Sequence, residues 1–212
     1  MIKEELKAAV GNDENILWSG TPDKLCFILE GIFNPLLPFA LIWAIFDLGF
    51  LSAMLFNEPI NEATPVLLFI IPFFLLHLMP VWIYIGGCFL VFRKYQNTAY
   101  IVTDKAIYTS GGFISYTIES KPFAELSHIN FHRGIFDQML GVGDVIATSE
   151  HDGYNTRQNL FRGITIADIK EYKQVYQLIK QLQTDIYADT MYPNDLRPAE
   201  NHGYKTKYIR PE

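Results

Sequence analysis

The chain has 212 residues, of which 50% are hydrophobic and 19% charged, and its formal net charge is -6. This length fits one ordinary domain with accessory structure, so a large multidomain assembly is excluded. Neither half of the chain has the excess of Lys and Arg that nucleic-acid binding needs, and the two cysteines, Cys26 and Cys88, are too few for a disulfide-stapled secreted module.

Residues 1–30 are expected to form a cytoplasmic N-terminal segment. Their polar, acidic start is the wrong pattern for a secretory signal, which needs a basic end followed directly by a short apolar core. The segment contains the motif Trp18-Ser19-Gly20-Thr21-Pro22. We therefore expect no cleaved leader.

Two long apolar stretches follow within residues 31–92. Residues 31–56 contain one charged residue, Asp47, and residues 65–92 contain none. Both exceed the roughly 20 residues that cross a bilayer as a helix, which predicts two transmembrane helices at about 33–56 and 65–92. Prolines within them, such as Pro80, predict kinks. The alternative, two buried helices of a soluble protein, would need a covering domain larger than residues 93–212.

The flanking charges predict the orientation of these helices. Lys24 precedes the first stretch, and Arg93 and Lys94 follow the second, whereas the connecting residues 57–64 contain no Lys or Arg. Positive charge favours the cytoplasmic side. The pattern therefore predicts a multi-pass protein of the plasma or inner membrane with both termini in the cytoplasm.

Two ionisable residues, Asp47 and His77, lie inside the apolar stretches. Counted from the outer ends at 1.5 Å per residue, they are about 14 and 18 Å deep, which makes them candidate neighbours. Ionisable groups at such depth are costly and face protein or water. We expect a structural hydrogen bond that fixes how the two helices pack; the alternative is a polar contact with another subunit or membrane protein.

Residues 93–187 have the sequence pattern of a β-rich domain. Strands are predicted at 97–103, 106–110, 114–121, 126–132, 145–149 and 159–166, with the clearest period-two alternation at Ile114, Tyr116 and Ile118. Short strands at this spacing, separated by turn residues, predict an antiparallel sandwich or barrel.

The last predicted element is an amphipathic helix. Asp168 and Glu171 match a capping box of the form D-x-x-E, which predicts that the helix begins at Asp168. Its apolar face repeats at three and four residues: Ile169, Tyr172, Val175, Tyr176, Ile179 and Leu182. Residues 188–212 are polar and are predicted to be a flexible tail.

Three motifs resemble those of bacterial pleckstrin-homology-like membrane proteins of the YdbS-like kind. They are the N-terminal Trp18, Gly20 and Pro22; the run from Tyr100 to Tyr108 with Thr103, Asp104 and Lys105; and Asp137, Leu140, Gly141 and Gly143. The resemblance implies a two-helix transmembrane hairpin followed by a mainly-β pleckstrin-homology-like barrel with one C-terminal helix. Ala106 stands where that family often has Arg, which puts any role of that basic side chain in doubt.

These motifs also have physical interpretations of their own. Thr103 and Asp104 at a strand end can bond the backbone to close a hairpin. Gly141 and Gly143 allow positive φ or a close backbone approach where a sheet corner turns. They are therefore predicted to be folding devices.

No residue pattern indicates catalysis. Gly141-Val142-Gly143-Asp144 reads as G-x-G-D, a signature of intramembrane aspartyl proteases, but it is remote from any apolar stretch, and Asp47 should not meet it. His128 and His132 would share a strand face but lack further ligands, so a surface strand is favoured over a metal site. Cys26 and Cys88 are expected to be small packing residues, with acylation as the alternative. We expect no enzyme, no cofactor and no metal.

The expected function is that of a membrane-tethered interaction module that binds a protein partner or self-associates. The alternative is binding of lipid or anionic headgroups by the β-rich domain, which needs several basic side chains on one loop pair. The available ones are scattered: Lys105, Lys121, Arg133, Arg157 and Arg162. A transporter is a distant third interpretation and would require an oligomer.

Overall fold

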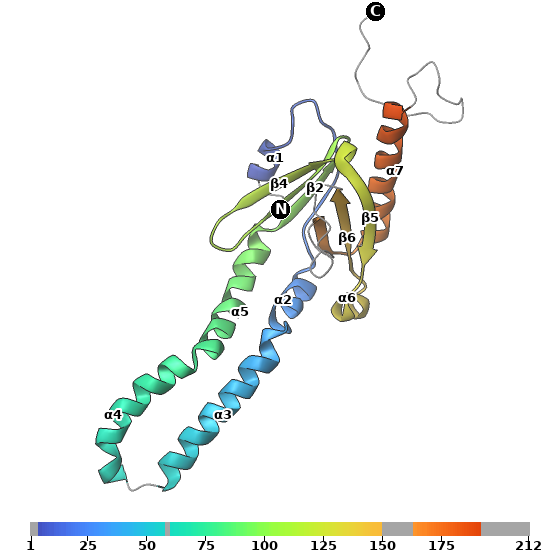
Figure 1. Ribbon diagram of the computed structural model, residues 1–212. Helices are drawn as coiled ribbons and strands as arrows, with labels where there is room; N and C mark the ends of the chain where they lie inside the picture. Colours follow the sequence, from blue (N-terminus) through green and yellow to red (C-terminus); the bar gives the residue numbers. More distant parts are fainter. Residues whose placement is uncertain (1–3, 58–59, 150–162, 192–212) are drawn as a thin grey trace, which may run out of the picture. The chain divides into compact units, whose positions relative to one another are not determined.

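The computed structural model describes residues 4–57, 60–149 and 163–191. The chain forms two compact units (Figure 1). Residues Ile28–Arg93 form one, here called the helical unit, and residues 1–27 together with 94–212 form the other, the β-rich unit. The chain passes between the units within α2 (Lys24–Ile32) and within α5 (Met79–Asn97).

The helical unit contains α3 (Leu36–Asn57), α4 (Ile60–His77) and most of α5. Among the helices of the described residues, α3 is the one that is by itself long and apolar enough to cross a membrane, over Leu36–Ala53. The end of α4 and all of α5 together are long and apolar enough for a second span, but the two helices meet at a bend of 52°. They provide a second span only if this bent pair is regarded as a single span. The single helix predicted for 65–92 is therefore two helices in the structure, and α2 is an additional helix that the sequence did not indicate.

The break between α4 and α5 has a local cause. Like any proline in a helix, Pro80 has no backbone N–H to donate to the preceding turn. The amides of Val81 and Trp82 instead bond to the carbonyl of Leu78, at 2.9 and 3.1 Å. The carbonyl of His77 is thereby freed from its usual helical partner, the Val81 amide, and becomes available to another part of the unit.

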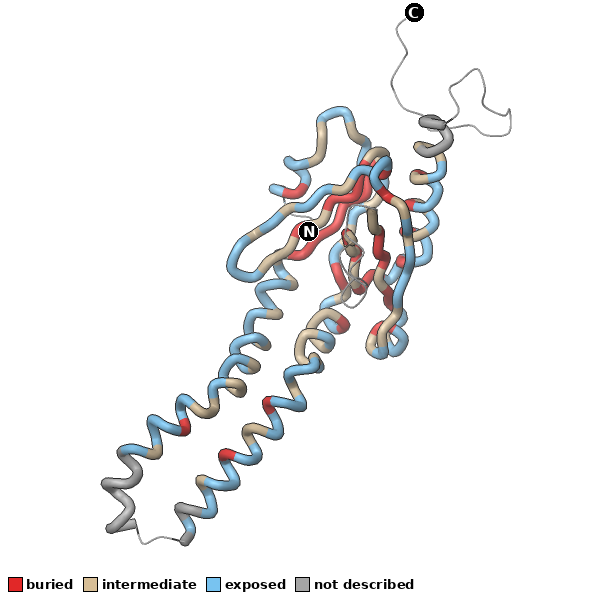
Figure 2. Tube along the Cα trace, in the orientation of Figure 1, coloured by how far each residue is buried: buried red, intermediate tan, exposed pale blue. Residues whose placement is uncertain are grey.

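Apolar side chains cover the outside of the helical unit. Figure 2 shows α3 and α5 mostly in the exposed colour, with intermediate positions between and two buried positions in α3. The exposed apolar residues include Leu41, Ile42, Ile45, Phe46, Leu48, Phe50, Phe69, Phe73, Leu75, Leu76, Ile83 and Phe89. Such a surface is the reverse of that of a water-soluble helix pair, which buries its apolar stripe.

The β-rich unit contains two antiparallel sheets. Four strands pair in the order β1-β2-β3-β4, namely Ile16–Gly20, Ala99–Thr103, Ala106–Gly111 and Thr117–Pro122. Three pair in the order β5-β6-β7, namely Leu126–His132, Gly143–Ser149 and Ile164–Ile169. Shorter helices are α1 (Glu4–Ala8), η1 (Phe123–Glu125) and α6 (Ile135–Leu140), and α7 (Tyr172–Met191) closes the unit.

This architecture corrects the predicted strands in three respects. Over the described residues the strands form two sheets and not a closed barrel. Strand β1 comes from the N-terminal segment, for which no strand was predicted, and pairs with β2 in the register Trp18 opposite Val102. Strand β4 begins at Thr117, so that Ile114 lies in the preceding turn, 86% exposed. Residues 159–162 of the last predicted strand lie outside the described residues.

The main core lies between the two sheets and α7. The apolar face predicted for the last helix is buried there, with Val175 at 1% and Ile179 at 0% exposure. Strand β2 is buried on both faces, because Tyr100 and Val102 face this core while Ala99 and Ile101 belong to a second cluster with Leu6 of α1. The N-terminal helix and strand are thus integral parts of the β-rich unit.

Candidate functional site

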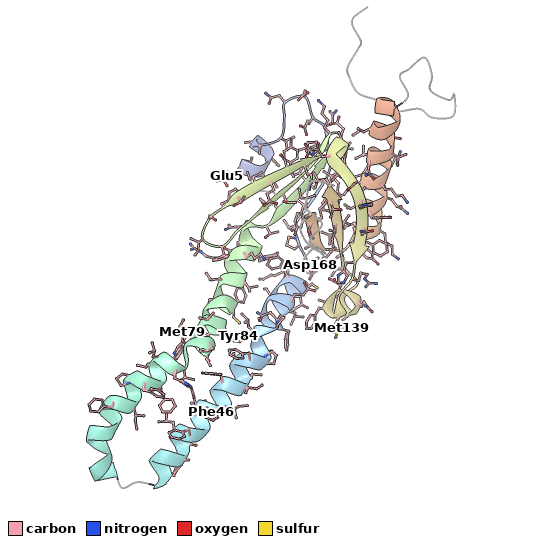
Figure 3. The ribbon with its side chains drawn as sticks, viewed as in Figure 1. Glu5, Phe46, Met79, Tyr84, Met139 and Asp168 are labelled. Atoms are coloured by element: carbon pink, nitrogen blue, oxygen red, sulfur yellow. The ribbon has the colours of Figure 1, made fainter. Side chains whose placement is uncertain are left out.

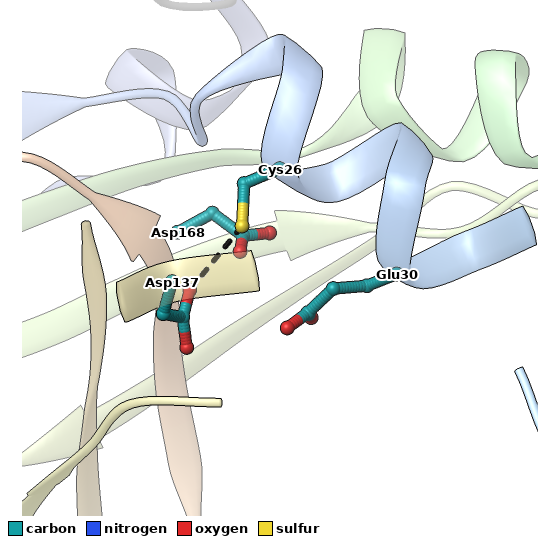
Figure 4. Close-up of side chains that lie close together, drawn as sticks. All are labelled: Cys26, Glu30, Asp137 and Asp168. Carbon is teal, nitrogen blue, oxygen red and sulfur yellow. Dashed lines mark hydrogen bonds between the residues drawn. The ribbon is translucent and has the colours of Figure 1, made fainter. Parts of the chain in front are cut away.

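A thiol and two carboxylates from three separate segments meet inside the β-rich unit. Cys26 comes from α2, Asp137 from α6 and Asp168 from the end of β7 (Figure 4). The Cys26 thiol donates a hydrogen bond to Oδ1 of Asp137 over 3.3 Å. All three residues are at least 98% buried. Burial first, and then the Asp168 and Asp137 carboxylates, raise the pKa of the Cys26 thiol well above its ordinary value, so the thiol acts as a donor and not as a nucleophile.

The motif around Asp137 builds and closes α6. Oδ2 of Asp137 accepts the amide of Gly134 at 2.7 Å, which caps the start of the helix. Gly141 ends the helix with a φ of 73°, the left-handed conformation that glycine adopts without a penalty. A Cβ on Gly143 would lie 3.0 Å from the ring of Tyr172 and from the side chain of Arg133. Each glycine therefore has the kind of role that the sequence indicates.

A further carboxylate, Asp144, extends this network to His132. Oδ1 of Asp144 accepts the amide of Asp168 at 2.8 Å, and Oδ2 lies 4.0 Å from Nδ1 of His132. Burial above all, and the nearby charge of Asp137, raise the pKa of Asp144 above its usual range, although the Asp168 amide opposes the shift.

The helix start predicted at Asp168 is wrong. Asp168 lies in β7 with a φ of 56°, and helix α7 begins at Tyr172. Its amide donates to Asp144, as above, and its carbonyl accepts the amide of Asp23 at 2.7 Å. These tertiary bonds hold Asp168 at the strand end, where it cannot cap α7.

The sulfur, oxygen and nitrogen atoms of this network lie close enough together to be considered as ligands of a metal cation. Cys26, Asp137 and Asp168 form one close group, and His132, Asp137 and Asp144 form another. Both oxygens of Asp137 already accept hydrogen bonds, from Gly134 and Cys26, and Oδ1 of Asp144 accepts one from Asp168. A cation would have to displace these bonds, so the arrangement is best explained as a buried hydrogen-bond network that joins α2, α6, β6 and β7.

Beside this network lies an open, polar cavity of about 380 Å³, lined by residues 18–24 and by Asp168, Lys170 and Glu171. The motif Trp18-x-Gly20-x-Pro22 forms one wall. A Cβ on Gly20 would lie 2.6 Å from the Trp18 ring, so Gly20 makes room for the indole against the core. Asp23 then caps α2, accepting the amides of Leu25 and Cys26.

The second motif closes the hairpin between β2 and β3. Oγ1 of Thr103 accepts the amides of Lys105 and Ala106 at 3.1 and 2.9 Å, as the residue types predict. Asp104 accepts both the amide and the side-chain nitrogen of Asn15, at 3.0 and 2.6 Å. The motif therefore also holds the N-terminal segment against the sheet, a role that the sequence did not indicate.

In the helical unit, Asp47 and His77 are hydrogen-bonded as expected. Nδ1 of His77 lies 2.9 Å from both carboxylate oxygens of Asp47. The imidazole stacks on Trp43 and Phe73, with ring centroids 5.1 and 5.2 Å away. Nε1 of Trp43 donates to the His77 carbonyl at 2.7 Å, the same carbonyl that the helix break frees. Asp47 is only 1% exposed, which favours the structural interpretation over a contact with another subunit.

The remaining candidates are dispersed over the β-rich unit. His128 and His132 lie on β5, and His132 is the one that approaches Asp144. Among the basic residues considered for headgroup binding, Lys105 pairs with Asp13, and Arg133 donates to the carbonyls of Val142 and Asp137. Two others, Arg157 and Arg162, lie outside the described residues, as do residues 192–212 of the predicted tail, whereas residues 188–191, predicted as flexible, belong to helix α7. Lys105 and Arg133 are thus engaged in contacts within the β-rich unit.

Comparison with known families identifies this architecture. The family model described as a bacterial PH domain, for pleckstrin homology, matches residues 62–183. The chain belongs to the bacterial PH domain family. No curated protein and no solved structure matches it.

The bacterial PH domain match fits the observed fold, since two antiparallel sheets followed by a C-terminal helix form a PH-like domain. It begins in α4, before the β-rich unit, and includes α5 and strands β2 to β7. Strand β1, with the Trp18 motif, lies outside the match although it completes the first sheet. The bacterial PH domain of this chain therefore depends on residues that the family match does not cover.

Proposed function

We propose that this chain is a non-enzymatic interaction module of the bacterial PH domain family, anchored in the inner membrane by its helical unit. Both termini lie in the cytoplasm, and the β-rich unit binds a protein partner or a second copy of the chain. The observation that carries the proposal is the apolar, exposed surface of α3, which is long enough to cross a bilayer at Leu36–Ala53.

The interior of the helical unit supports membrane anchoring. An ionisable residue is tolerated in hydrocarbon only if other groups of the protein satisfy it. Asp47 is satisfied by His77 inside the unit, while the outward residues of α3, such as Ile42 and Ile45, are apolar and 68% and 71% exposed. The helical unit therefore has polar groups inside and apolar groups outside, which is the arrangement that a lipid environment favours.

The β-rich unit supports binding rather than catalysis. Among its buried titratable groups, the Cys26 thiol donates to Asp137, whose other oxygen caps α6, so these two side chains are engaged in holding the fold and are not arranged as a nucleophile with its base. Strands β4 and β5 lie at sheet edges, with most of their residues exposed. An exposed edge can accept a strand of a partner through backbone hydrogen bonds.

Two measurements test the proposal. After cell lysis, the intact chain should pellet with membranes, resist extraction by alkaline carbonate and dissolve in detergent. Recovery in the supernatant without detergent would contradict anchoring. In mild detergent, light scattering after size-exclusion chromatography and co-purification should then reveal an oligomer or a defined partner; a monodisperse monomer with no partner would contradict the interaction role.

A pair of variants separates anchoring from folding. Ile45→Lys places a charge at an exposed position of α3, which should reduce carbonate resistance because a central charge costs about 2.5–3.5 kcal/mol on insertion scales. Leu17→Lys alters an equally apolar exposed position on β1 and should leave carbonate resistance unchanged.

A further inference from the structure

Two short segments of the β-rich unit expose large apolar side chains. The turn between β3 and β4 carries Phe113 and Ile114, which are 45% and 86% exposed. Helix α6 carries Ile135 and Met139, one turn apart and each 76% exposed; Met139 is labelled in Figure 3. We call Phe113 and Ile114 the first apolar tip, and Ile135 and Met139 the second apolar tip. Exposed apolar residues are common singly, so their place in the unit must decide what covers them.

The first apolar tip is fixed to the point at which α5 enters the β-rich unit. The side-chain nitrogen of Asn97 donates to the carbonyl of Gly112 at 3.0 Å, and Oγ of Ser110 donates to the carbonyl of Asn97 at 2.9 Å. Asn97 is the last residue of α5. The turn with Phe113 and Ile114 is thus tied to the end of that helix.

The second apolar tip is held next to α2, the helix through which the chain leaves the β-rich unit. Asp137, in the middle of α6, accepts the thiol hydrogen bond of Cys26, which directly precedes Phe27. The two points themselves lie close together, since the rings of Phe27 and Tyr95 are 5.9 Å apart and Nζ of Lys94 lies 5.8 Å from the Phe27 ring. Both tips therefore belong to the end of the β-rich unit at which the apolar helices begin.

We propose that the apolar tips insert into the lipid surface of the membrane that anchors the chain. The inference rests on the proposed anchoring. Phe92, the last apolar residue of α5, precedes Asn97 by five positions, which is about 8 Å at the rise of a helix. If α5 leaves the hydrocarbon just after Phe92, the turn that is held at Asn97 must lie at the headgroup region. Arg93 and Lys94 at the same point match anionic headgroups, whereas Phe113 and Ile114 lie in a segment without charge, Ser110–Tyr116.

Site-specific photocrosslinking in the full-length chain tests this inference. A photoreactive amino acid is placed at Ile114 or Met139, with Leu17 as the control position, and the chain is reconstituted into vesicles of phosphatidylethanolamine and phosphatidylglycerol. Leu17 is 47% exposed but lies at the opposite end of the sheet, where its neighbour Ile16 is opposite Thr103, at the far end of β2. Four residues of strand, about 13 Å, separate that end from Ala99.

The expected result is lipid adduct at positions 114 and 139 in yields at least about ten times that at position 17, because a side chain in the interface is surrounded by lipid. Equal yields at all three positions in a carbonate-resistant chain would overturn the inference and leave the anchoring intact. Adducts to protein instead of lipid at 114 and 139 would also overturn it. A carbonate-extractable chain would overturn the anchoring and the inference together.

Discussion

Nδ1 of His77 lies 2.9 Å from both carboxylate oxygens of Asp47, two residues that are 30 positions apart on different helices. The break after α4 adds a second contact between the same helices, because the freed carbonyl of His77 accepts a hydrogen bond from Nε1 of Trp43. One kink, an aromatic stack and an ionisable pair therefore hold α3 against α4 within the helical unit. The break in the helix, at which the Val81 amide bonds to Leu78, thus frees the acceptor that this contact uses.

Loss of one partner of this pair should destabilise the helical unit. Asp47→Leu or His77→Leu leaves the other side chain without its hydrogen bond in an apolar setting, and we expect a loss of about 1–2 kcal/mol in unfolding free energy. Asp47→Asn, which keeps an acceptor, should lose less. Unfolding in mixed detergent micelles measures the effect. The double variant should lose less than the sum of the two single variants; strict additivity would show that the pair contributes no coupling.

The Cys26 thiol is expected to resist alkylation in the folded chain. It is 0% exposed, and burial together with its carboxylate neighbours raises its pKa, so almost no thiolate is present at neutral pH. Maleimide labelling followed by mass spectrometry should modify Cys26 only after unfolding. Fast modification under native conditions would contradict the burial of this network.

Replacement of Cys26 distinguishes hydrogen bonding from simple packing. Cys26→Ser keeps a donor toward Asp137, whereas Cys26→Ala removes it and leaves a buried carboxylate oxygen without this partner. We expect Cys26→Ala to lose about 1–3 kcal/mol and Cys26→Ser to lose less. Thermal unfolding of both variants provides the measurement, and an alanine variant as stable as the serine variant would refute the role of the hydrogen bond.

The partly buried carboxyl of Asp144 should add a pH dependence that favours the folded state in acid. Because the folded-state pKa of Asp144 is raised above its unfolded value, its contribution is fully present below about pH 3.8 and is lost as the pH rises through the raised pKa. Asp144→Asn keeps an acceptor for the Asp168 amide but cannot ionise. The stability of this variant relative to the natural chain should therefore increase from about pH 4 upward. A difference that does not vary with pH would contradict the shift.

The elements that the sequence predicts well are those with a strong local pattern. The apolar face of α7, from Val175 to Leu182, follows from the helical period alone, and the Thr103 hairpin follows from turn chemistry. Asp47 and His77 were predicted as neighbours because an ionisable group in an apolar helix has few tolerable environments.

The features that the sequence does not predict depend on contacts between distant segments. Strand β1 is too short to stand out, and only its pairing with β2, more than 80 residues later, makes it a strand. The pattern of Asp168 and Glu171 fits a helix cap locally, but bonds to Asp23 and Asp144 decide the conformation of Asp168. The meeting of Cys26 with Asp137 has no local signal, because it requires the folded unit.

The Trp18 motif should be sensitive to the size of the residue at position 20. A Cβ at Gly20 would lie 2.6 and 2.7 Å from two atoms of the indole ring, so Gly20→Val must displace Trp18 from the core or bend β1 away from β2. We expect a loss of about 1–3 kcal/mol, the usual cost of overpacking. Trp18 fluorescence in a chain with Trp43 and Trp82 replaced by Phe should shift to longer wavelength. Unchanged emission and stability would contradict the packing of glycine under the ring.

Gly112 and Gly111 provide the sharpest matched pair of substitutions in the β-rich unit. Gly112 has a φ of 117°, and an added Cβ would lie 1.8 Å from the carbonyl oxygen of Ser115, whereas a Cβ on Gly111 would meet nothing within 4 Å. Gly112→Ala therefore requires the turn to rearrange and should destabilise the domain by about 1–3 kcal/mol, while Gly111→Ala should have little effect. Chemical denaturation of the two variants in detergent measures the difference. Because Asn97 bonds to the Gly112 carbonyl, Gly112→Ala should also speed amide exchange at the end of α5, and equal exchange rates in both variants would show that the turn is not held there.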